Sequence, residues 1–407
     1  MVSRKPLSQK TKANSRFAPQ LLAWYGRHGR DLPWRRTRDP YRILVSEMML
    51  QQTQVSRVLE YYHRFLEVFP DINALANAPL DRVLKAWEGL GYYARARHLH
   101  RAARLIVERY GPVVPDELEA LQNLPGVGYS TAASVASLAY GRHWPVLDGN
   151  AIRVLCRVFR ISGDPRTTAG KRRLVDLAKR LVPPGKIGPF NQAIMDLGSQ
   201  ICRPAHPRCE DCPLIGICGG HAGGDPTRYP RKREKKPRPH YDVTAGIIWE
   251  SENGKKNRAR HGRVKSGGSR RADHIGENVH SDDRGGRRLL IARRRMEDLL
   301  GGLWEFPGGK QENGETLEEC LRREIKEELD IAIRVDTPFL RLDHGYSHFR
   351  ITLHAFHCTY LEGTPRPLGC SDFRWVRISD LETFPLSRAD QKLAAALRGE
   401  RSPFSPA

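Results

Sequence analysis

The sequence predicts a protein of two domains, an all-α domain followed by an α+β domain, and three observations support this prediction. The chain has 407 residues, which is enough for two or three domains with substantial cores. Apolar residues recur at helical spacing over residues 15 to 200, with no convincing strand-like alternation. After Cys218 a segment rich in Gly, Pro and cations leads into strand-like runs.

The first domain, expected over residues 15–220 after a flexible basic N-terminus at 1–14, contains many short helices. Residues 53–69 carry an apolar stripe of residues three to four positions apart, as in an amphipathic helix. Residues 93–111 repeat the pattern and stop at Gly111-Pro112, a pair that ends helices. Further short helices are expected at 117–123, 130–140, 150–160, 167–181 and 188–200.

The second domain, expected over residues 241–400 after a linker at 221–240, has four strand-like runs around one clear helix, 316–329. The runs are Val243–Trp249, Arg288–Ala292, Ile351–His357 and Phe373–Val376. Residues 251–287 contain seven glycines, no aromatics and ten Lys/Arg against five Asp/Glu, so they cannot bury a core. We expect a disordered insertion there, with a sequence-independent phosphate-binding tail as the alternative.

The charge balance predicts a polyanionic partner. The chain has 68 Lys and Arg against 46 Asp and Glu, a formal charge of +22. Nucleic acid and anionic membrane are the two candidates, but no apolar run approaches the roughly 20 residues that span a bilayer. The N-terminal residues are basic without an apolar segment, which argues against secretion. We therefore expect a cytoplasmic, nucleoid-associated bacterial protein that binds nucleic acid and no membrane.

Four of the eight cysteines lie close together, and their spacing predicts a metal centre. In a chain without an export signal, such clustering suggests metal binding rather than disulfides. Four thiolates ligate either tetrahedral zinc or an iron–sulfur cluster. Zinc ribbons usually pair two C-x2-C knuckles, and this loop has one, which favours a cubane cluster over zinc. The cluster cysteines are Cys202, Cys209, Cys212 and Cys218, whereas Cys156, Cys320, Cys358 and Cys370 read as ordinary buried thiols.

One acid stands in an apolar segment. Glu47 lies within ILVSEMML, and burial of an unpaired carboxylate costs several kcal/mol or forces the group to keep its proton. Either Glu47 points out of a buried helix, or its proton has a chemical use. Farther along, Asp148 precedes a predicted helix, where a simple N-cap is the alternative to a chemical role.

Between these two acids, the segment LPGVGYSTA (124–132) lies between two predicted helices. Gly126 and Gly128 allow a tight turn and let backbone N–H groups approach a phosphate closely. This helix–hairpin–helix pattern binds the DNA backbone without reading sequence, although a plain Pro-Gly turn also fits.

Taken in order, these features resemble the MutY-type adenine DNA glycosylases, which join a helix–hairpin–helix domain to a Nudix-like domain. The resemblance covers residues 15–220 and rests on segments that include DLPWR (31–35), SEMMLQQTQV (46–55), WEGLGYYARARHLH (87–100), LPGVGYSTA, LDGNAIRVLCR, FNQAIMDLG (190–198) and the cysteine loop. It implies hydrolytic removal of adenine mispaired with 8-oxoguanine or guanine in duplex DNA, by a monomer carrying a 4Fe–4S cluster. It also implies that Glu47 protonates adenine N7 and that Asp148 stabilises the oxocarbenium-like sugar.

The resemblance assigns further residues. It implies wedge residues that enter the duplex while the base leaves the stack, namely Gln52, Thr53, Leu90 and Tyr92. It implies an adenine pocket of Arg30, Trp34, Arg35, Asn150 and Gln192, although Trp34 also suits ordinary core packing. Ser130 stands at the hairpin position where strand-cleaving relatives carry a Schiff-base lysine. Because a hydroxyl cannot form an iminium, we expect base removal without efficient strand cleavage.

Residues 308–331 resemble the Nudix box. Matching positions are Gly309, Glu315, Arg323, Glu324, Ile325, Glu327 and Glu328, with Asp330 where a glycine is expected. Three of the glutamates fall on one helix face, where they can hold Mg²⁺, whereas a solvated acidic face is the simple alternative. In the family this domain reads 8-oxoguanine, and Tyr346, Ser347 and His348 resemble its base-contacting Phe-Ser-His loop. Mg-dependent nucleotide hydrolysis is the alternative function, beside a mispair-binding protein without chemistry and a strand-cleaving endonuclease.

Overall fold

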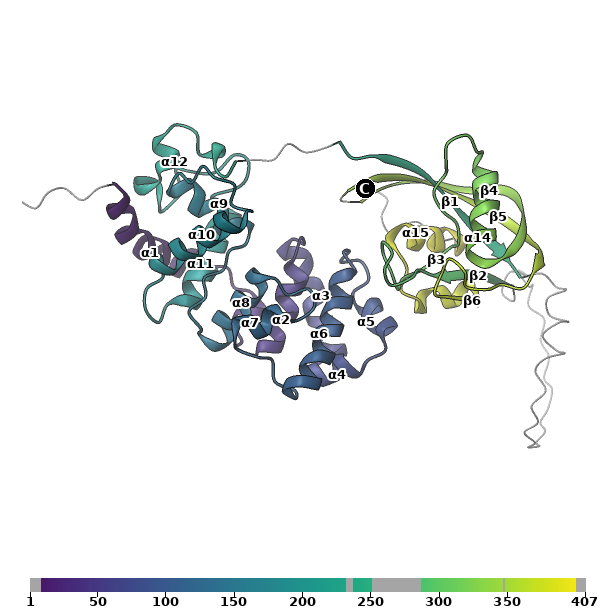
Figure 1. The fold of residues 1–407 in the computed structure, drawn as a ribbon, viewed down its shortest axis with the longest axis horizontal. Coiled ribbons are helices and arrows are strands. Elements are labelled where there is room, and N and C mark those ends of the chain that lie inside the picture. The colour runs from purple at the N-terminus through teal and green to yellow at the C-terminus, as the bar shows by residue number, and fades with distance from the viewer. Residues whose placement is uncertain (1–8, 232–236, 251–286, 347, 400–407) are drawn as a thin grey trace, which may run out of the picture. The chain divides into compact units, whose positions relative to one another are not determined.

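The computed structural model describes residues 9–231, 237–250, 287–346 and 348–399. The expectations for residues 1–8, for residues 232–236 of the linker, for residues 251–286 of the insertion predicted at 251–287, for Ser347 and for residue 400 fall outside these described residues. The chain divides into two compact units (Figure 1). Unit 1 comprises Met1–Pro79 and Arg95–Lys235, and unit 2 comprises Leu80–Ala94 and Lys236–Ala407.

Unit 1 is helical, and the described part of it contains no strand, which confirms the predicted fold class. Its α-helices are α1 (Gln9–His28), α2 (Pro40–Leu50), α3 (Val55–Val68), α4 (Ile72–Asn77), α6 (Ala94–Tyr110), α7 (Leu118–Gln122), α8 (Tyr129–Tyr140), α9 (Gly149–Val158), α10 (Thr168–Leu181), α11 (Ile187–Gln200) and α12 (Gly219–Ala222). Short 3-10 turns occur at Pro33–Arg35, Ile215–Ile217 and Pro226–Arg228.

Local chemistry explains where the helices nearest the candidate site begin. Asp39 caps α2 by accepting hydrogen bonds from the amides of Tyr41 and Arg42, and Pro40 occupies the first helical position. Asp148 caps α9 by accepting from the Ala151 amide. An apolar core joins α1, α9, α10 and α11, and the rings of Phe17 and Phe190 lie 6.0 Å apart within it. Among the described helices, none is both long and apolar enough to cross a membrane.

Unit 2 contains a six-stranded mixed sheet with two principal helices, the predicted α+β class. Its elements are α5 (Leu80–Ala86), β1 (His240–Trp249), β2 (Arg288–Arg293), β3 (Trp304–Glu305), α14 (Leu317–Leu329), β4 (Ile331–Gly345), β5 (Arg350–Gly363), β6 (Asp372–Arg377), a 3-10 turn at Ile378–Thr383 and α15 (Arg388–Leu397). The strand order is β3-β2-β1-β5-β4, with β6 paired to β2. Strands β1 and β5 run parallel, and the other pairs are antiparallel.

The sheet lies between two helices. Leu290 and Ala292 of β2 pack in one core cluster with the apolar face of α14. Leu289 and Ile291 of the same strand pack in the other cluster, which contains residues of α15. Successive strand residues point to opposite faces, so β2 is apolar throughout. The unit therefore has three layers, with the Nudix-box helix α14 covering one face.

The segment Leu80–Ala94 belongs to unit 2 through polar contacts with the turn before α15. Lys85 Nζ donates to the Phe384 carbonyl at 3.3 Å, and the Leu386 amide donates to Glu88 Oε1 at 3.0 Å. The Tyr93 hydroxyl lies 3.4 Å from the Leu386 carbonyl. This segment carries two of the predicted wedge residues, Leu90 and Tyr92.

Candidate active site

Glu47 lies in the last two turns of α2, among fully buried neighbours that include Val45, Met48 and Met49. The carboxyl itself is half-buried. Burial raises the pKa of Glu47 to about 7, against the effect of the Ser134 hydroxyl, which lowers it. Ser134, on α8, is fully buried, and its hydroxyl has no partner at ordinary hydrogen-bond distance among the described residues. A carboxyl with such a pKa holds its proton in a large share of molecules at neutrality.

Asp148 is half-buried at the start of α9 and is held by two hydrogen bonds. Its Oδ1 accepts from the Ala151 amide at 2.7 Å, and its Oδ2 accepts from Asn150 Nδ2 at 2.7 Å. Burial raises the pKa of Asp148, and these two bonds together with Arg153 oppose that rise. The N-cap alternative and the chemical role are therefore compatible, because the cap uses one oxygen and fixes the carboxylate in place.

The fold brings Glu47 and Asp148 into one electrostatic environment, although they are far apart in the sequence. The charge of Asp148 raises the pKa of Glu47, and the charge of Arg35 lowers it. Two carboxyls in different surroundings are the arrangement that lets one donate a proton while the other carries negative charge.

The predicted pocket arginines share a partner that the sequence did not reveal. Arg30 donates from Nε and Nη2 to Asp196 Oδ1 at 2.8 and 2.5 Å, and Arg35 donates to both oxygens at 2.8 and 2.9 Å. Asp196 is fully buried on α11. Burial raises the pKa of its carboxyl, but the bonds from Arg35 and Arg30 prevail and hold it below its usual range. The sequence gives only a weak signal for Asp196, because it is simply an acid four residues after Gln192 on one helix face.

The other pocket residues have contacts inside unit 1. Gln192 Oε1 accepts from the Tyr25 hydroxyl at 2.6 Å. Trp34 is 4% exposed and packs edge-on against Tyr62 with ring centroids 5.3 Å apart, as a core residue does. Asn150 links Asp148 to Arg153, because its Oδ1 accepts from Arg153 Nη2 at 2.8 Å.

The hairpin between α7 and α8 has the predicted backbone. Gly126 has φ of +74°, and a Cβ there would lie 2.6 Å from the Cβ of His98, so a glycine is required on two grounds. Gly128 is exposed and caps α8, and Ser130 is half-buried in the first turn of that helix. The first amides of a helix have no partners inside it, which is the setting that suits an anion.

Two predicted wedge residues adopt the left-handed backbone region without being glycine. Gln52 has φ of +58° and is exposed, and Tyr92 has φ of +50° and is 38% exposed. Leu90, by contrast, is 5% exposed. Left-handed backbone at non-glycine residues costs about 1–2 kcal/mol and is concentrated at functional sites.

The four clustered cysteines line one cavity together with Arg157. All four are free thiols, half-buried, and Cys202 Sγ lies 3.4 Å from Arg157 Nη1. Burial raises the pKa of Cys212 to about 12, so a buried thiolate set here requires bound positive charge. Four thiols that line one cavity are the type of donor that an iron–sulfur cluster takes, although the described residues contain no group of three or more His, Cys, Asp or Glu side chains already placed to hold a metal ion. Arg157, fully buried, also donates to the carbonyls of Arg203 and Pro204 and was not predicted.

In unit 2, the structure describes two of the three residues of the predicted base-contacting loop. Tyr346 is half-buried, with its ring 4.7 Å from His344 and 4.8 Å from Phe349. Burial raises the pKa of Tyr346 to about 12, and a bond with Ser387 opposes this. His348 is exposed, and Ser347 lies outside the described residues.

Each of the two units is similar to a known protein family. A family model described as the HhH-GPD superfamily of base excision DNA repair proteins matches residues 45–180, and a NUDIX domain model matches residues 282–396. The human adenine DNA glycosylase is 34% identical over 411 residues, covering 95% of this chain and 74% of its own length. The Mycobacterium tuberculosis adenine DNA glycosylase is 42% identical over 215 residues, covering 52% of this chain and 70% of its own. A thermostable thymine-DNA glycosylase structure superposes with a TM-score of 0.50 at 33% identity, covering 53% of this chain and 100% of that one.

Fold and site thus define a base excision repair glycosylase of the helix–hairpin–helix class with a Nudix domain attached. The similarity to the human adenine DNA glycosylase extends over 95% of this chain and narrows the class further. The chain belongs to the adenine DNA glycosylases, which are hydrolases of N-glycosyl bonds.

Proposed function

We propose that this enzyme removes adenine paired with 8-oxoguanine or guanine in duplex DNA, and that it does so without efficient strand cleavage. The observation that carries the proposal is Glu47, whose pKa is raised to about 7 beside a second carboxyl, Asp148. Adenine must leave the stack, because the reacting atoms are unreachable inside a duplex.

The two carboxyl groups have different roles in the proposed reaction. Glu47 donates its proton to N7, so that adenine leaves as a neutral base rather than as an anion. Asp148, held by Ala151 and Asn150, presents negative charge to the oxocarbenium-like sugar and assists the attacking water. Arg30, Arg35, Asn150 and Gln192 form the proposed adenine pocket, with Asp196 fixing the two arginines.

Monofunctional action follows from Ser130. Strand cleavage of the lyase type needs an amine that forms an iminium with the sugar, and a hydroxyl at this hairpin position cannot form one. The exposed Gly126–Gly128 turn supports phosphate binding, and Gln52, Thr53, Leu90 and Tyr92 support unstacking of the target pair. We place recognition of the opposite base at Tyr346, Ser347 and His348.

We further propose a 4Fe–4S cluster on Cys202, Cys209, Cys212 and Cys218, supported by the fact that all four line one cavity. When bound, such a cluster ties the loop 202–218 into one structure. Arg157 and Arg153 connect this loop to α9, since Arg153 Nε donates to the Cys202 carbonyl at 2.6 Å.

Single-turnover assays on duplexes with adenine opposite 8-oxoguanine, guanine or thymine test the main proposal. Adenine release from the first two and little from the third is the expected result. No release from the 8-oxoguanine duplex would overturn the proposed function, and a borohydride-trapped covalent adduct would overturn its monofunctional part.

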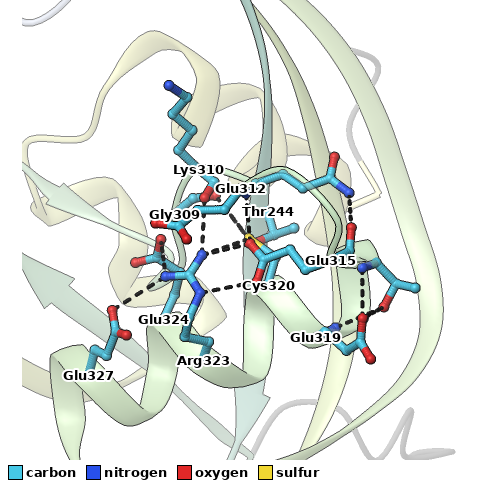
Figure 2. A network of polar contacts seen from close by, with 12 residues as sticks. Thr244, Gly309, Lys310, Glu312, Glu315, Glu319, Cys320, Arg323, Glu324 and Glu327 are labelled. Carbon is cyan, nitrogen blue, oxygen red and sulfur yellow. Dashed lines mark hydrogen bonds and ion pairs between the residues drawn. The ribbon is translucent and has the colours of Figure 1, made fainter.

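A second candidate activity, Mg-dependent nucleotide hydrolysis, is favoured by the Nudix box in unit 2. Arg323 donates to Glu315 at 2.7 Å, to Glu324 at 3.1 Å and to Glu327 at 3.3 Å, as Figure 2 shows. A Cβ on Gly309 would collide with the Glu324 carboxyl, so the box glycine is required here. Burial raises the pKa of Glu324 and Glu328, which are close to each other, and a divalent cation would relieve that cost.

Glu327→Gln and Glu47→Gln separate the two activities. Hydrolysis of a nucleoside triphosphate with Mg²⁺ that is lost in Glu327→Gln and kept in Glu47→Gln would establish the second activity. No turnover by the unmodified protein would exclude hydrolysis of the nucleotide tested.

A further inference from the structure

The end of α2 is held by a buried arginine from another helix. Arg95, 5% exposed in the first turn of α6, directs Nη1 at the carbonyls of Met48, Met49 and Gln51, at 3.1, 2.5 and 2.5 Å. Its Nη2 donates to Thr53 Oγ1 at 3.0 Å. Carbonyls in the last turn of a helix have no partners inside the helix and carry partial negative charge, so a guanidinium there is well placed.

The turn that follows α2 has little internal support. Its backbone bond is Thr53 N to the Leu50 carbonyl at 3.3 Å, and Gln52 is held at φ of +58°. The turn is fixed from two sides instead. Arg95 holds it from α6, and Gln51 Nε2 holds it from the hairpin side, 3.3 Å from the Gly126 carbonyl and 3.1 Å from Thr131 Oγ1.

The bonds of Arg95 fall beside residues that the proposed function uses. Glu47 lies one residue before the first carbonyl that Arg95 contacts, and Gln52 and Thr53 are within or beside its bonds. Tyr92, the other left-handed wedge candidate, precedes Arg95 by three residues. The orientation of the exposed Gln52 side chain depends on a strained backbone that Arg95 keeps in place.

We propose that Arg95 is a positioning residue for base extrusion: it holds the Gln51–Thr53 turn in the conformation that inserts Gln52 into the duplex. This inference rests on the proposed function, in which the turn replaces the stacking lost when adenine swings out. Arg95 itself touches no reacting atom.

Arginine is required for this task and lysine does not replace it. A planar guanidinium reaches three carbonyls and a hydroxyl at once, whereas one ammonium on a flexible stem reaches fewer of them in fixed geometry. Arg95→Lys keeps the buried charge, so its effect reports on the lost bonds. The matched control is Arg104→Lys, an exposed arginine on the same helix.

The experiment uses the full chain and two DNA duplexes. In the first, adenine is paired with 8-oxoguanine in an intact duplex; in the second, the same pair lies in a short bubble of mismatches, where unstacking costs less. Single-turnover adenine release is measured on both. Fluorescence of 2-aminopurine at the target position reports unstacking, and a thermal melt confirms that each variant is folded at the assay temperature.

We expect Arg95→Lys to lose about 10- to 100-fold in rate on the intact duplex, the effect of a lost charged hydrogen bond. On the bubble the loss should shrink to less than about 3-fold, and the 2-aminopurine signal should fall on the intact duplex alone. Arg104→Lys should stay within about 2-fold on both.

Equal losses on the two duplexes, or no loss, would overturn the inference, because a merely structural role would affect both alike. If the unmodified enzyme released no adenine from either duplex, the proposed function would fail first. An active enzyme with equal losses in Arg95→Lys refutes the positioning role alone.

Discussion

Glutamates stand in two opposite settings in this molecule. In unit 1, Glu47 lies among apolar residues, and burial raises its pKa to about 7, whereas the Ser134 hydroxyl and the charge of Arg35 lower it. In unit 2, Glu315 accepts from Arg323 and from the Glu312 amide, and these bonds lower its pKa to about 2. One side chain is prepared to give a proton, and the other holds a permanent charge.

The difference shows that the partner decides what a carboxyl can do. Asp196 is the intermediate case, as buried as any group near Glu47 but paired with Arg30 and Arg35, and its pKa is low. Burial without a cationic partner produces an acid, and burial with one produces a fixed anion. The predictions below test this contrast.

The largest effect is expected for Glu47→Gln, which removes the proton donor and keeps the shape. Single-turnover adenine release should fall by about 10²–10⁴-fold, while DNA binding is retained. Glu327→Gln in the Nudix box is the matched control and should leave adenine release unchanged. If adenine release fell equally in both variants, the distinction between Glu47 and the glutamates of the Nudix box would be wrong.

Asp196→Asn should cause the next largest effect, on stability. Removing the charge leaves the guanidinium groups of Arg35, 9% exposed, and Arg30, 29% exposed, without their anionic partner. Breaking a buried ion pair in this way costs about 3–5 kcal/mol. Thermal unfolding measures it. Asp31→Asn, which breaks an exposed pair with Arg36, should leave the unfolding midpoint almost unchanged. A stable Asp196→Asn protein would contradict the role assigned to this carboxylate.

The pH dependence should follow Glu47. Because the acid must be protonated, adenine release should fall as pH rises through about 7. Ser134 and Arg35 lower this pKa and Asp148 raises it, so Ser134→Ala should move the midpoint to higher pH, by up to about one unit. Ser46→Ala is the control, since the buried Ser46 hydroxyl bonds inside its own helix. If the midpoint does not move in Ser134→Ala, the Ser134 hydroxyl does not lower the pKa of Glu47.

The smallest effect on repair is expected in unit 2. Arg323→Met should raise the pKa of Glu315 from about 2 toward its ordinary value of 4.5, which carboxyl NMR titration measures. Adenine release should change by less than about 2-fold, because the carboxylates that Arg323 contacts, Glu315, Glu324 and Glu327, all belong to the Nudix box. A Glu315 pKa that stays near 2 would show that the Glu312 amide suffices.

Most elements were predictable from local pattern. The predicted helix 167–181 is α10 over Thr168–Leu181, and the predicted 316–329 is α14, which starts at the capping box of Thr316. Strand β4 was missed because its exposed positions carry charges such as Arg334, Asp336 and Arg341, which hide the alternation. Its structure comes from pairing with β5, a long-range contact that local sequence does not encode. Helix α15 was not predicted either.

The candidate site residues were also only partly predictable from local sequence. Glu47 and the four cysteines could be singled out as candidates because an acid in an apolar run and a close thiol spacing are visible locally. Asp196 and Arg95 were not, because an Asp or Arg in a helix is ordinary until its partner is known. Their partners lie 161 to 166 and 42 to 47 residues away.

By itself, the sequence determined the two fold classes, most of the helices and strands, the thiol set and the identity of the unusual acid, since each depends on composition and short-range periodicity. Tertiary structure alone decided how those groups behave. Burial beside Ser134 and Asp148 sets the proton affinity of Glu47, and paired arginines make Asp196 an anion. Desolvation and charge are properties of surroundings, and the surroundings exist only after distant segments have packed together.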